Sequence, residues 1–318
     1  MRKVLRDMLS LYLTGALLLL GNAAAGIVDH NVIVHRGDRM NLLDLAQSLN
    51  LTVFVEAMEK THLDNTIDHE GPYTLFSPLN IAFENIPDYT KEYSLGDLMK
   101  LHVARGDYLE KELKDEQLIR SLLSKRDVRI NIYKKKSGKL ITANGQKLNE
   151  TDFDAHNGVL HIIDGVMNSI YAREGTALKE VSSGALPYYS FNTLSRAVKS
   201  SDVVTSLLDG SGPLTLFAPS DKAFSRLPDS VNDYLLKNKT ALEYVLKYHA
   251  ISGRTWFTIG LEDNMNLQTA ATIPLTVSIK QDGVKVGDAK VVLPDFCVAN
   301  GVVHIIDNVL LPPGFPQF

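Results

Sequence analysis

Apolar residues near the beginning of the chain recur with the period of a helix. Between positions 42 and 58 they lie mostly three or four residues apart, at Leu42, Leu45, Leu49, Val53, Phe54, Ala57 and Met58. This spacing places them on one face, so the segment is predicted to be an amphipathic helix. The run Thr74-Leu75-Phe76 then predicts a short strand. Ser77-Pro78 predicts the start of another helix, because serine caps helices and proline suits their first position.

Later in the chain the pattern changes to strict alternation, which is typical of strands. Val128, Ile130 and Ile132 alternate with polar residues ahead of a turn at Ser137-Gly138. The same pattern recurs further on, as Val277 with Ile279, Val284 with Val286, Val291 with Leu293, and turns at Asp282-Gly283 and Gly287-Asp288. Since helices come first and a mostly antiparallel sheet follows, the predicted fold class is α+β.

The whole pattern occurs twice. NGVLHIID at 157–164 returns as NGVVHIID at 300–307, and YTLFSPLNIAF at 73–83 returns as LTLFAPSDKAF at 214–224. LMKLHVARG at 98–106 returns as VLKYHAISG at 245–253. The copies keep the same order and lie 141 to 147 residues apart. That period is far too long for a solenoid unit, so a complete domain is duplicated.

The first residues are typical of a secretory signal. A basic start precedes the apolar run 9–21, which is too short to span a bilayer, and small residues at 23–25 suit cleavage. We therefore expect a secreted protein without a membrane span. The predicted organisation is a signal peptide at 1–25, an arm at 26–40, a first domain at 41–171, a linker at 172–187, a second domain at 188–313 and a tail at 314–318.

Composition narrows the functional classes. The net charge of −4 over 318 residues offers no basic surface for nucleic acid. The single cysteine, Cys297, lies in an apolar segment and is expected to be buried rather than reactive.

Histidine is the chemically versatile residue that recurs in both copies, as His102 with His161 and His249 with His304. A metal site needs three or four converging ligands, and no recurrent cysteine or glutamate cluster joins these pairs. No repeated serine occupies a nucleophilic turn. The histidines are therefore interpreted as structural, and neither a cofactor, a metal nor catalysis is predicted.

Three motifs, TLFxPxxxAFxxxP, a Tyr-His segment and NGVxHIID, occur in this order in both copies, with Leu-His for Tyr-His in the first. In this combination the chain resembles the fasciclin family. The resemblance implies two tandem fasciclin-like domains, each a wedge of β-strands flanked by helices. It also implies a role in cell adhesion or matrix assembly without catalysis, with integrin-type cell-surface receptors and matrix proteins as partners.

The resemblance carries over two adhesion motifs. One is the Tyr-His pair, present as Tyr248-His249, whereas the first copy has Leu101-His102. The other is an Asp-Ile pair, replaced here by Asp-Phe at Asp152 and Asp295. An aspartate can ligate a cation bound to an integrin. For both motifs the alternative is packing, because apolar residues repeated in a fold-defining segment usually belong to the core.

Two Arg-Gly-Asp triplets are further candidates for receptor binding. Arg36-Gly37-Asp38 lies in the predicted terminal arm, where it would be accessible. Arg105-Gly106-Asp107 lies where the copies align, and its glycine has a counterpart in Gly253. Glycine supplies the turn that splays the two charges, but three residues also occur together by chance.

Surface chemistry completes the prediction. The Asn-x-Ser/Thr triplets at Asn50, Asn149 and Asn238 are candidate glycosylation sites, of which the last two lie in more polar surroundings. Lysines 134–136 and 139 beside a turn would attract sulfated glycans or protect a sheet edge.

The favoured hypothesis is a secreted adhesion or matrix protein that acts through surface contacts. The alternative is an extracellular carrier that holds a small apolar ligand between sheet and helices.

Overall fold

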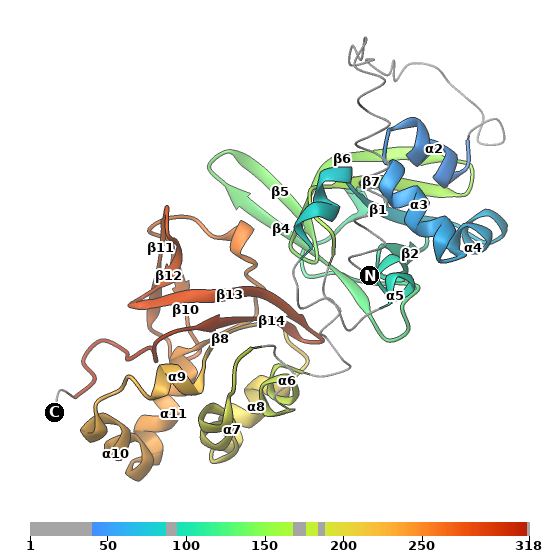
Figure 1. Cartoon of the computed structure of the whole chain (residues 1–318). Helices are drawn as coiled ribbons and strands as arrows, with labels where there is room; N and C mark the ends of the chain where they lie inside the picture. The colour runs from blue at the N-terminus through green and yellow to red at the C-terminus, as the bar shows by residue number, and fades with distance from the viewer. Residues whose placement is uncertain (1–39, 87–93, 168–175, 184–187, 317–318) are drawn as a thin grey trace. The chain divides into compact units, whose positions relative to one another are not determined.

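The computed structural model describes residues 40–86, 94–167, 176–183 and 188–316 (Figure 1). These residues form two compact units. One is drawn from Met1–Ile130 and Ile141–Ile170, and the other from Asn131–Leu140 and Tyr171–Phe318. Each of the two repeats combines helices with a seven-stranded sheet, so the α+β prediction is confirmed.

The first repeat opens with three short helices, α2 (Leu42–Ser48), α3 (Thr52–Lys60) and α4 (Leu63–His69). The predicted helix over 42–58 is therefore two helices. They are separated at Asn50, whose φ of 60° lies in the left-handed region that asparagine tolerates better than most residues. The periodic apolar residues still face inward, since Leu42, Phe54 and Met58 are fully buried.

The sheet of the first repeat has the strand order β2-β1-β7-β6-β5-β4-β3. Its strands are β1 (Tyr73–Pro78), β2 (Val103–Arg105), β3 (Leu118–Arg120), β4 (Asp127–Lys135), β5 (Gly138–Ala143), β6 (Gln146–Ala155) and β7 (Gly158–Ile163). The two ends of the sheet meet through a bridge between Ala104 and Ser121. This contact closes the sheet into a barrel-like form, which leaves fewer edges exposed.

Three further helical segments connect the strands of the first repeat: η2 (Asn80–Asn85), α5 (Leu95–Leu101) and η4 (Glu110–Glu112). The predicted helix start at Ser77-Pro78 is wrong, because both residues belong to β1 and the helical turn begins only at Asn80. In the second repeat the equivalent strand ends at Pro219, and the helix α9 (Asp221–Phe224) follows it closely. Ser220 caps this helix and accepts a hydrogen bond from Ala223 N–H.

The second repeat follows the same plan, with the strand order β10-β11-β12-β13-β14-β8-β9. Its strands are β8 (Leu214–Pro219), β9 (Ala250–Ser252), β10 (Asn266–Gln268), β11 (Pro274–Lys280), β12 (Gly283–Val286), β13 (Ala289–Val298) and β14 (Gly301–Ile306). Its helices are α6 (Ala177–Ser183), α7 (Asn192–Lys199), α8 (Asp202–Asp209), α9 (Asp221–Phe224), α10 (Asp229–Lys237), α11 (Lys239–Tyr248) and η6 (Thr258–Gly260). Figure 1 shows the α-helices gathered on one side of the β8–β14 part of the sheet.

Part of the predicted linker at 172–187 is helical. Within it, Ala177–Ser183 form α6, which packs against α7 and α8 and buries Ala177 and Val181. Ala177 N–H donates to Asn300 as Leu42 N–H of α2 donates to Asn157, so α6 occupies the place of α2.

The central strands are buried along their whole length. All six residues of β1, β7, β8 and β14 are buried. β1 pairs in parallel with β7, and β8 with β14. The strands on either side of these pairs, β2 and β6 in the first repeat and β9 and β13 in the second, pair with them antiparallel. A parallel pair covered on both faces needs a nearly continuous apolar run, which the repeated motifs provide. The recurrent histidine of each octapeptide lies inside this run.

Candidate functional site

His161 and His304 occupy the same place in the two repeats. Each lies in register with a phenylalanine of the parallel neighbour strand, Phe76 or Phe217. The ring centroids are 5.6 Å apart in the first repeat and 5.3 Å apart in the second. Both histidines are fully buried, so their ring nitrogens need hydrogen-bond partners within the protein.

Both nitrogens of each ring have such partners. In the first repeat, His161 Nε2–H donates to the carbonyl of Tyr108 at 2.8 Å, and Nδ1 accepts from Asp152 N–H at 3.1 Å. In the second, His304 Nε2–H donates to the carbonyl of Trp256 at 2.8 Å, and Nδ1 accepts from Asp295 N–H at 3.1 Å. Because Nδ1 must accept, the bonded rings are neutral and carry their proton on Nε2.

The aspartates complete this arrangement from bulges in β6 and β13. Asp152 and Asp295 have φ angles of 66° and 65°, at positions where the strand register shifts. Oδ1 of Asp152 accepts from Glu110 N–H at 2.7 Å. Asp295 accepts from Thr258 N–H at 2.8 Å, and its other oxygen accepts from the Thr258 hydroxyl. We call each pair, Asp152 with His161 and Asp295 with His304, an Asp–His clamp.

Each clamp fastens a loop to the sheet. The loop begins after β2 or β9 and contains the short helix η4 or η6. A threonine from the neighbouring strand adds a further tie, since the hydroxyl of Thr74 donates to the Gly106 carbonyl and accepts from Tyr108 N–H. Thr215 does the same with Arg254 and Trp256. Sequence reasoning missed these threonines, and their repetition is the only signal that could have identified them.

Burial is the main influence on the charge state of the clamp histidines. Burial lowers the pKa of His161, opposed by the Tyr108 hydrogen bond and by the carboxylates of Asp152 and Glu110. Burial also lowers the pKa of His304, opposed chiefly by Asp295. Both rings are therefore neutral near pH 7.

The second histidine of each repeat uses the opposite tautomer. His102 Nδ1–H donates to the Leu98 carbonyl at 2.9 Å, and Nε2 accepts from Met167 N–H at 2.9 Å. His249 makes the same pair of bonds, to the Val245 carbonyl at 2.8 Å and from Leu310 N–H at 2.9 Å. Burial lowers the pKa of each to about 4.

The other polar residues of the octapeptide also form hydrogen bonds that stabilise the fold. Asn157 accepts from Leu42 N–H and donates to the Ile67 carbonyl, at 2.9 and 2.8 Å. Asp164 accepts from Lys147 N–H at 2.9 Å, and Asp307 accepts from Lys290 N–H at 2.8 Å.

The glycine of the octapeptide is fixed by a close approach of two backbones. A Cβ at Gly158 would lie 1.9 Å from the Tyr73 carbonyl oxygen, and one at Gly301 would lie 1.8 Å from that of Leu214. No side chain fits at such a distance. The octapeptide is therefore repeated because its polar residues form hydrogen bonds within the fold and its glycine allows two strands to approach closely.

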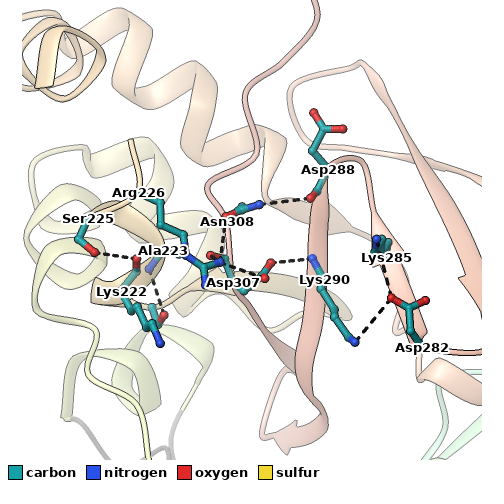
Figure 2. A network of polar contacts seen from close by, with 11 residues as sticks. Lys222, Ala223, Ser225, Arg226, Asp282, Lys285, Asp288, Lys290, Asp307 and Asn308 are labelled. Carbon is teal, nitrogen blue, oxygen red and sulfur yellow. Dashed lines mark hydrogen bonds and ion pairs between the residues drawn. The ribbon is translucent and has the colours of Figure 1, made fainter. Parts of the chain in front are cut away.

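In the second repeat, Asp307, which ends the octapeptide, belongs to a network of hydrogen bonds and ion pairs at the surface. Figure 2 shows Arg226 reaching the backbone and carboxylate of Asp307, at 2.8 and 3.0 Å. Lys290 and Lys285 approach Asp282, at 3.7 and 3.9 Å. These groups are partly exposed, and the network joins the end of α9 to the sheet.

The fasciclin-domain family model matches residues 49–169 and again 189–312. This chain belongs to the fasciclin family. The two matches fall on the two repeats just described, so the duplicated motifs are the signature of two tandem fasciclin domains.

Relatives of these fasciclin domains occur in animals and bacteria. Human periostin is 27% identical over 271 residues, which cover 81% of this chain and 30% of periostin. Pig transforming growth factor-beta-induced protein ig-h3 is 26% identical over 278 residues, covering 85% of this chain and 39% of that protein. Protein sll1483 of Synechocystis sp. is 39% identical over 126 residues, or 39% of this chain and 68% of that protein. This chain thus spans less than two fifths of the length of either animal relative.

A solved structure of a FAS1 domain pair from the insect cell adhesion molecule fasciclin I also aligns with this chain. The alignment covers 82% of this chain and 96% of that one, at 18% identity and a TM-score of 0.39.

The Tyr-His motif of the second fasciclin domain lies in the core. Tyr248 is 5% exposed and its hydroxyl donates to the Pro274 carbonyl at 3.4 Å. His249 is 1% exposed, and both of its ring nitrogens bond to backbone groups. Neither side chain reaches the surface, so direct receptor contact, as the motif implied, does not fit this conformation.

The aspartates of the two clamps are the motif residues that reach solvent. The side chain of Asp152 is 40% exposed and that of Asp295 is 32% exposed. Their hydrogen bonds differ. Among the described residues, Asp152 accepts through Oδ1 alone, whereas Asp295 uses both oxygens on Thr258.

The triplet Arg105-Gly106-Asp107 begins at the last residue of β2. Arg105 is exposed, but one carboxylate oxygen of Asp107 is buried. Arg105 and Gly106 border a hollow of about 480 Å³ whose other lining residues are Glu70, Gly71, Pro72 and Tyr73. The two charges are thus not presented equally to solvent. Arg36, Gly37 and Asp38 lie outside the described residues.

The three candidate glycosylation sites differ in geometry. Asn50 and Asn149 are exposed. Asn238 caps α11, accepts from Ala241 N–H at 3.0 Å and donates to the Tyr234 hydroxyl at 3.1 Å. A glycan on the Asn238 amide would displace the tyrosine bond, so Asn50 and Asn149 suit the modification better.

Other sequence predictions concern single residues. Lys134, Lys136 and Lys139 are exposed, whereas Lys135 is half-buried. Cys297 is buried, as its apolar surroundings indicated. In the described parts of the chain, no group of three or more histidine, cysteine or acidic residues is arranged to hold a metal ion. The same parts contain no helix of the length and hydropathy needed to cross a membrane.

Proposed function

We propose that this protein is a secreted adhesion or matrix protein whose fasciclin domains bind cell-surface receptors or matrix components through exposed side chains. Membership of the fasciclin family supports the proposal, because the family resemblance implies adhesion. The two animal relatives are much longer than this chain, so their partners come to it only as part of the proposal.

The observation that carries the proposal is the state of Asp152. Its carboxylate is partly exposed, and Oδ2 is left without a hydrogen bond among the described residues. A carboxylate oxygen of this kind can complete the coordination of a receptor-bound divalent cation, which prefers oxygen ligands. Asp295 is less suited, because Thr258 engages both of its oxygens. The first fasciclin domain is therefore the receptor-binding one in this proposal, assisted by Asp38 of the amino-terminal triplet.

The proposal includes no catalytic activity. It is supported by the recurrent histidines, whose ring nitrogens are all engaged by backbone groups. A general base needs a ring nitrogen that can reach a substrate, and every ring nitrogen of these four histidines is already hydrogen-bonded to the backbone.

Cell attachment to the coated protein tests the proposal. Asp152→Asn keeps an acceptor for Glu110 N–H and tolerates the left-handed backbone, but removes the charge that a cation needs. We expect attachment in the presence of divalent cations to fall several-fold for this variant and to be abolished by chelation. Asp154→Asn, at an exposed position on the same strand, is the matched control. Attachment that is indifferent to chelation, to Asp152→Asn and to Asp38→Asn would refute the proposal, as would a bound apolar ligand without attachment.

Sulfated glycans are proposed as additional partners, supported by the three exposed lysines at the β4–β5 turn. Clustered ammonium groups attract polyanions, and salt screens the attraction. The triple change of Lys134, Lys136 and Lys139 to Gln should lower the salt concentration at which the protein leaves immobilised heparin. The same change at the exposed Lys199, Lys222 and Lys237 removes equal charge elsewhere and should have a smaller effect.

A further inference from the structure

Both Asp–His clamps depend on a histidine nitrogen that accepts a backbone hydrogen bond. We propose that each clamp is an acid-sensitive latch, which loosens the loop at residues 108–112 or 256–260 when its histidine becomes protonated. The proposal concerns the conformation of the fasciclin domains and does not depend on what they bind.

Protonation of a clamp histidine is incompatible with the geometry of its bonds. A protonated imidazole carries N–H groups on both nitrogens and can accept no hydrogen bond. The N–H of Asp152 lies 3.1 Å from Nδ1 of His161, and the N–H of Asp295 lies 3.1 Å from Nδ1 of His304. Protonation would set two N–H groups against each other at this distance, so the bond to the bulge must break.

Each ring is faced by acidic side chains. Oδ1 of Asp152 lies 3.9 Å from Nδ1 of His161. The negative charge of Glu110 also favours the protonated ring and so raises the pKa of His161. Oδ1 of Asp295 lies 3.8 Å from Nδ1 of His304. The aromatic neighbours in register with the rings, Phe76 and Phe217, are uncharged.

A new positive charge would therefore draw the aspartate carboxylate toward the ring. That same carboxylate holds the loop, through Glu110 N–H in the first domain and through Thr258 in the second. When the aspartate carboxylate moves toward the charged ring, its hydrogen bond to the loop becomes weaker. The Nε2 bond to the Tyr108 or Trp256 carbonyl survives protonation, so the expected response is a loosened loop rather than an unfolded domain.

The direction of the linkage follows from burial. Burial lowers the pKa of both histidines below the ordinary value of 6.5, so the closed latch binds protons less readily than an open one that admits water. The closed form is therefore favoured above pH 6.5 and is progressively lost as the pH falls below it. Burial also holds His102 and His249 neutral, with pKa values of about 4.

The second domain offers a direct reporter of its latch. Trp256, whose carbonyl accepts the His304 bond, is the single tryptophan among 318 residues. Its backbone N–H is held by the Thr215 hydroxyl at 2.8 Å. Loosening of residues 256–260 would hydrate the indole and shift its fluorescence emission to longer wavelength.

The test follows tryptophan emission and far-UV circular dichroism of the full chain from pH 7.5 to pH 4.5. We expect the emission to shift to longer wavelength before the circular dichroism changes. His304→Gln, which keeps a donor but cannot titrate in this range, should abolish the early shift. His156→Gln replaces an exposed histidine and should retain it. An emission change that coincides with loss of helix signal, that is absent, or that persists in His304→Gln would overturn the proposal.

If His304→Gln does not fold at pH 7.5, nitrogen NMR of the histidine rings in the wild-type protein decides the question. The latch requires that Nδ1 of His304 becomes protonated within the pH range of the emission shift, and that the Asp295 amide loses its protection from exchange there. A ring that stays neutral through the shift, or an Asp295 amide that stays protected, would refute the latch equally well.

Discussion

The side chain of Asn300 accepts a hydrogen bond from the backbone N–H of Ala177 at 2.9 Å, across 123 residues of sequence. Its amide group also donates to the carbonyls of Leu208 and Gly210, at 2.9 and 2.8 Å. One buried asparagine thus joins the beginning of α6 and the end of α8 to the turn before β14. Asn157 makes the equivalent contacts to Leu42 and Ile67 in the first domain.

Removal of the Asn300 side chain should therefore destabilise the second domain. Asn300→Ala leaves one buried N–H and two carbonyls without their partner, and we expect a loss of about 2–4 kcal/mol in the free energy of unfolding. Urea unfolding followed by Trp256 emission reports on this domain. Gln281→Ala, at an exposed turn of the same domain, should change the midpoint little. Equal midpoints for the two variants would contradict the structural role of Asn300.

A methyl group at Gly301 should be more damaging than one at another glycine of the same domain. In Gly301→Ala the new Cβ would lie 1.8 Å from the Leu214 carbonyl oxygen, within the central parallel pair. The strands would have to separate, and we expect a cost above about 3 kcal/mol or failure to fold. Gly253 has a φ of 83°, but a Cβ added there would meet no atom within 4 Å, so Gly253→Ala should cost only about 1 kcal/mol of backbone strain. Thermal unfolding of both variants tests the order.

Stability should fall with acidity because of the buried histidines. His249 has a folded pKa of about 4, against an ordinary value of 6.5. The unfolded chain binds a proton more readily, so the contribution of this residue is fully present above pH 6.5 and is lost as the pH falls toward 4. Within this window, each such histidine should lower the free energy of unfolding by up to about 1.4 kcal/mol per pH unit.

Urea midpoints at pH 7, 6 and 5 measure this dependence. A variant without the titrating ring, His249→Gln, should be less stable at pH 7 but should show a shallower fall, whereas His156→Gln should follow the wild type. A wild-type midpoint that is constant from pH 7 to pH 5 would show that the histidines are not held neutral.

Replacing Arg226 and replacing Asp307 should reduce the free energy of unfolding by different amounts, although the two residues form one ion pair. Arg226 is 46% exposed, and ion pairs of this kind contribute below about 1 kcal/mol, so Arg226→Ala should have a small effect. Asp307→Ala also removes the acceptor of Lys290 N–H and should cost about 1–2 kcal/mol more. The exposed pair Lys237–Asp233 supplies the control, since Lys237→Ala should be neutral. A larger effect for Arg226 than for Asp307 would show that the surface pair dominates.

Much of the fold was predictable because it depends on local pattern. The alternation at Val277–Ile279 and the Asp282-Gly283 turn predicted β11 and β12, since period and turn chemistry act within a few residues. The duplication predicted that both halves would fold alike. The linker prediction missed α6 because that helix is short and is stabilised by packing and by Asn300, which lies far away in the sequence.

The candidate site was predictable in composition but not in exposure. Repetition identified His161 and His304 and favoured a structural role for them, whereas the family resemblance pointed to Asp152 and Asp295. It could not distinguish the buried Tyr248-His249 pair from a surface motif, because an apolar flank is typical of both.

By itself, the sequence determined that two copies of one α+β domain follow each other, since repeated letters and hydrophobic periods are properties of the chain alone. Only the tertiary structure decided that Asp152 keeps an oxygen for solvent while Thr258 occupies both oxygens of Asp295. Only the structure decided, too, which tautomer each buried histidine adopts. The physical reason is that hydrogen bonds and burial depend on groups brought together from distant positions, such as His304 and Trp256, which are 48 residues apart.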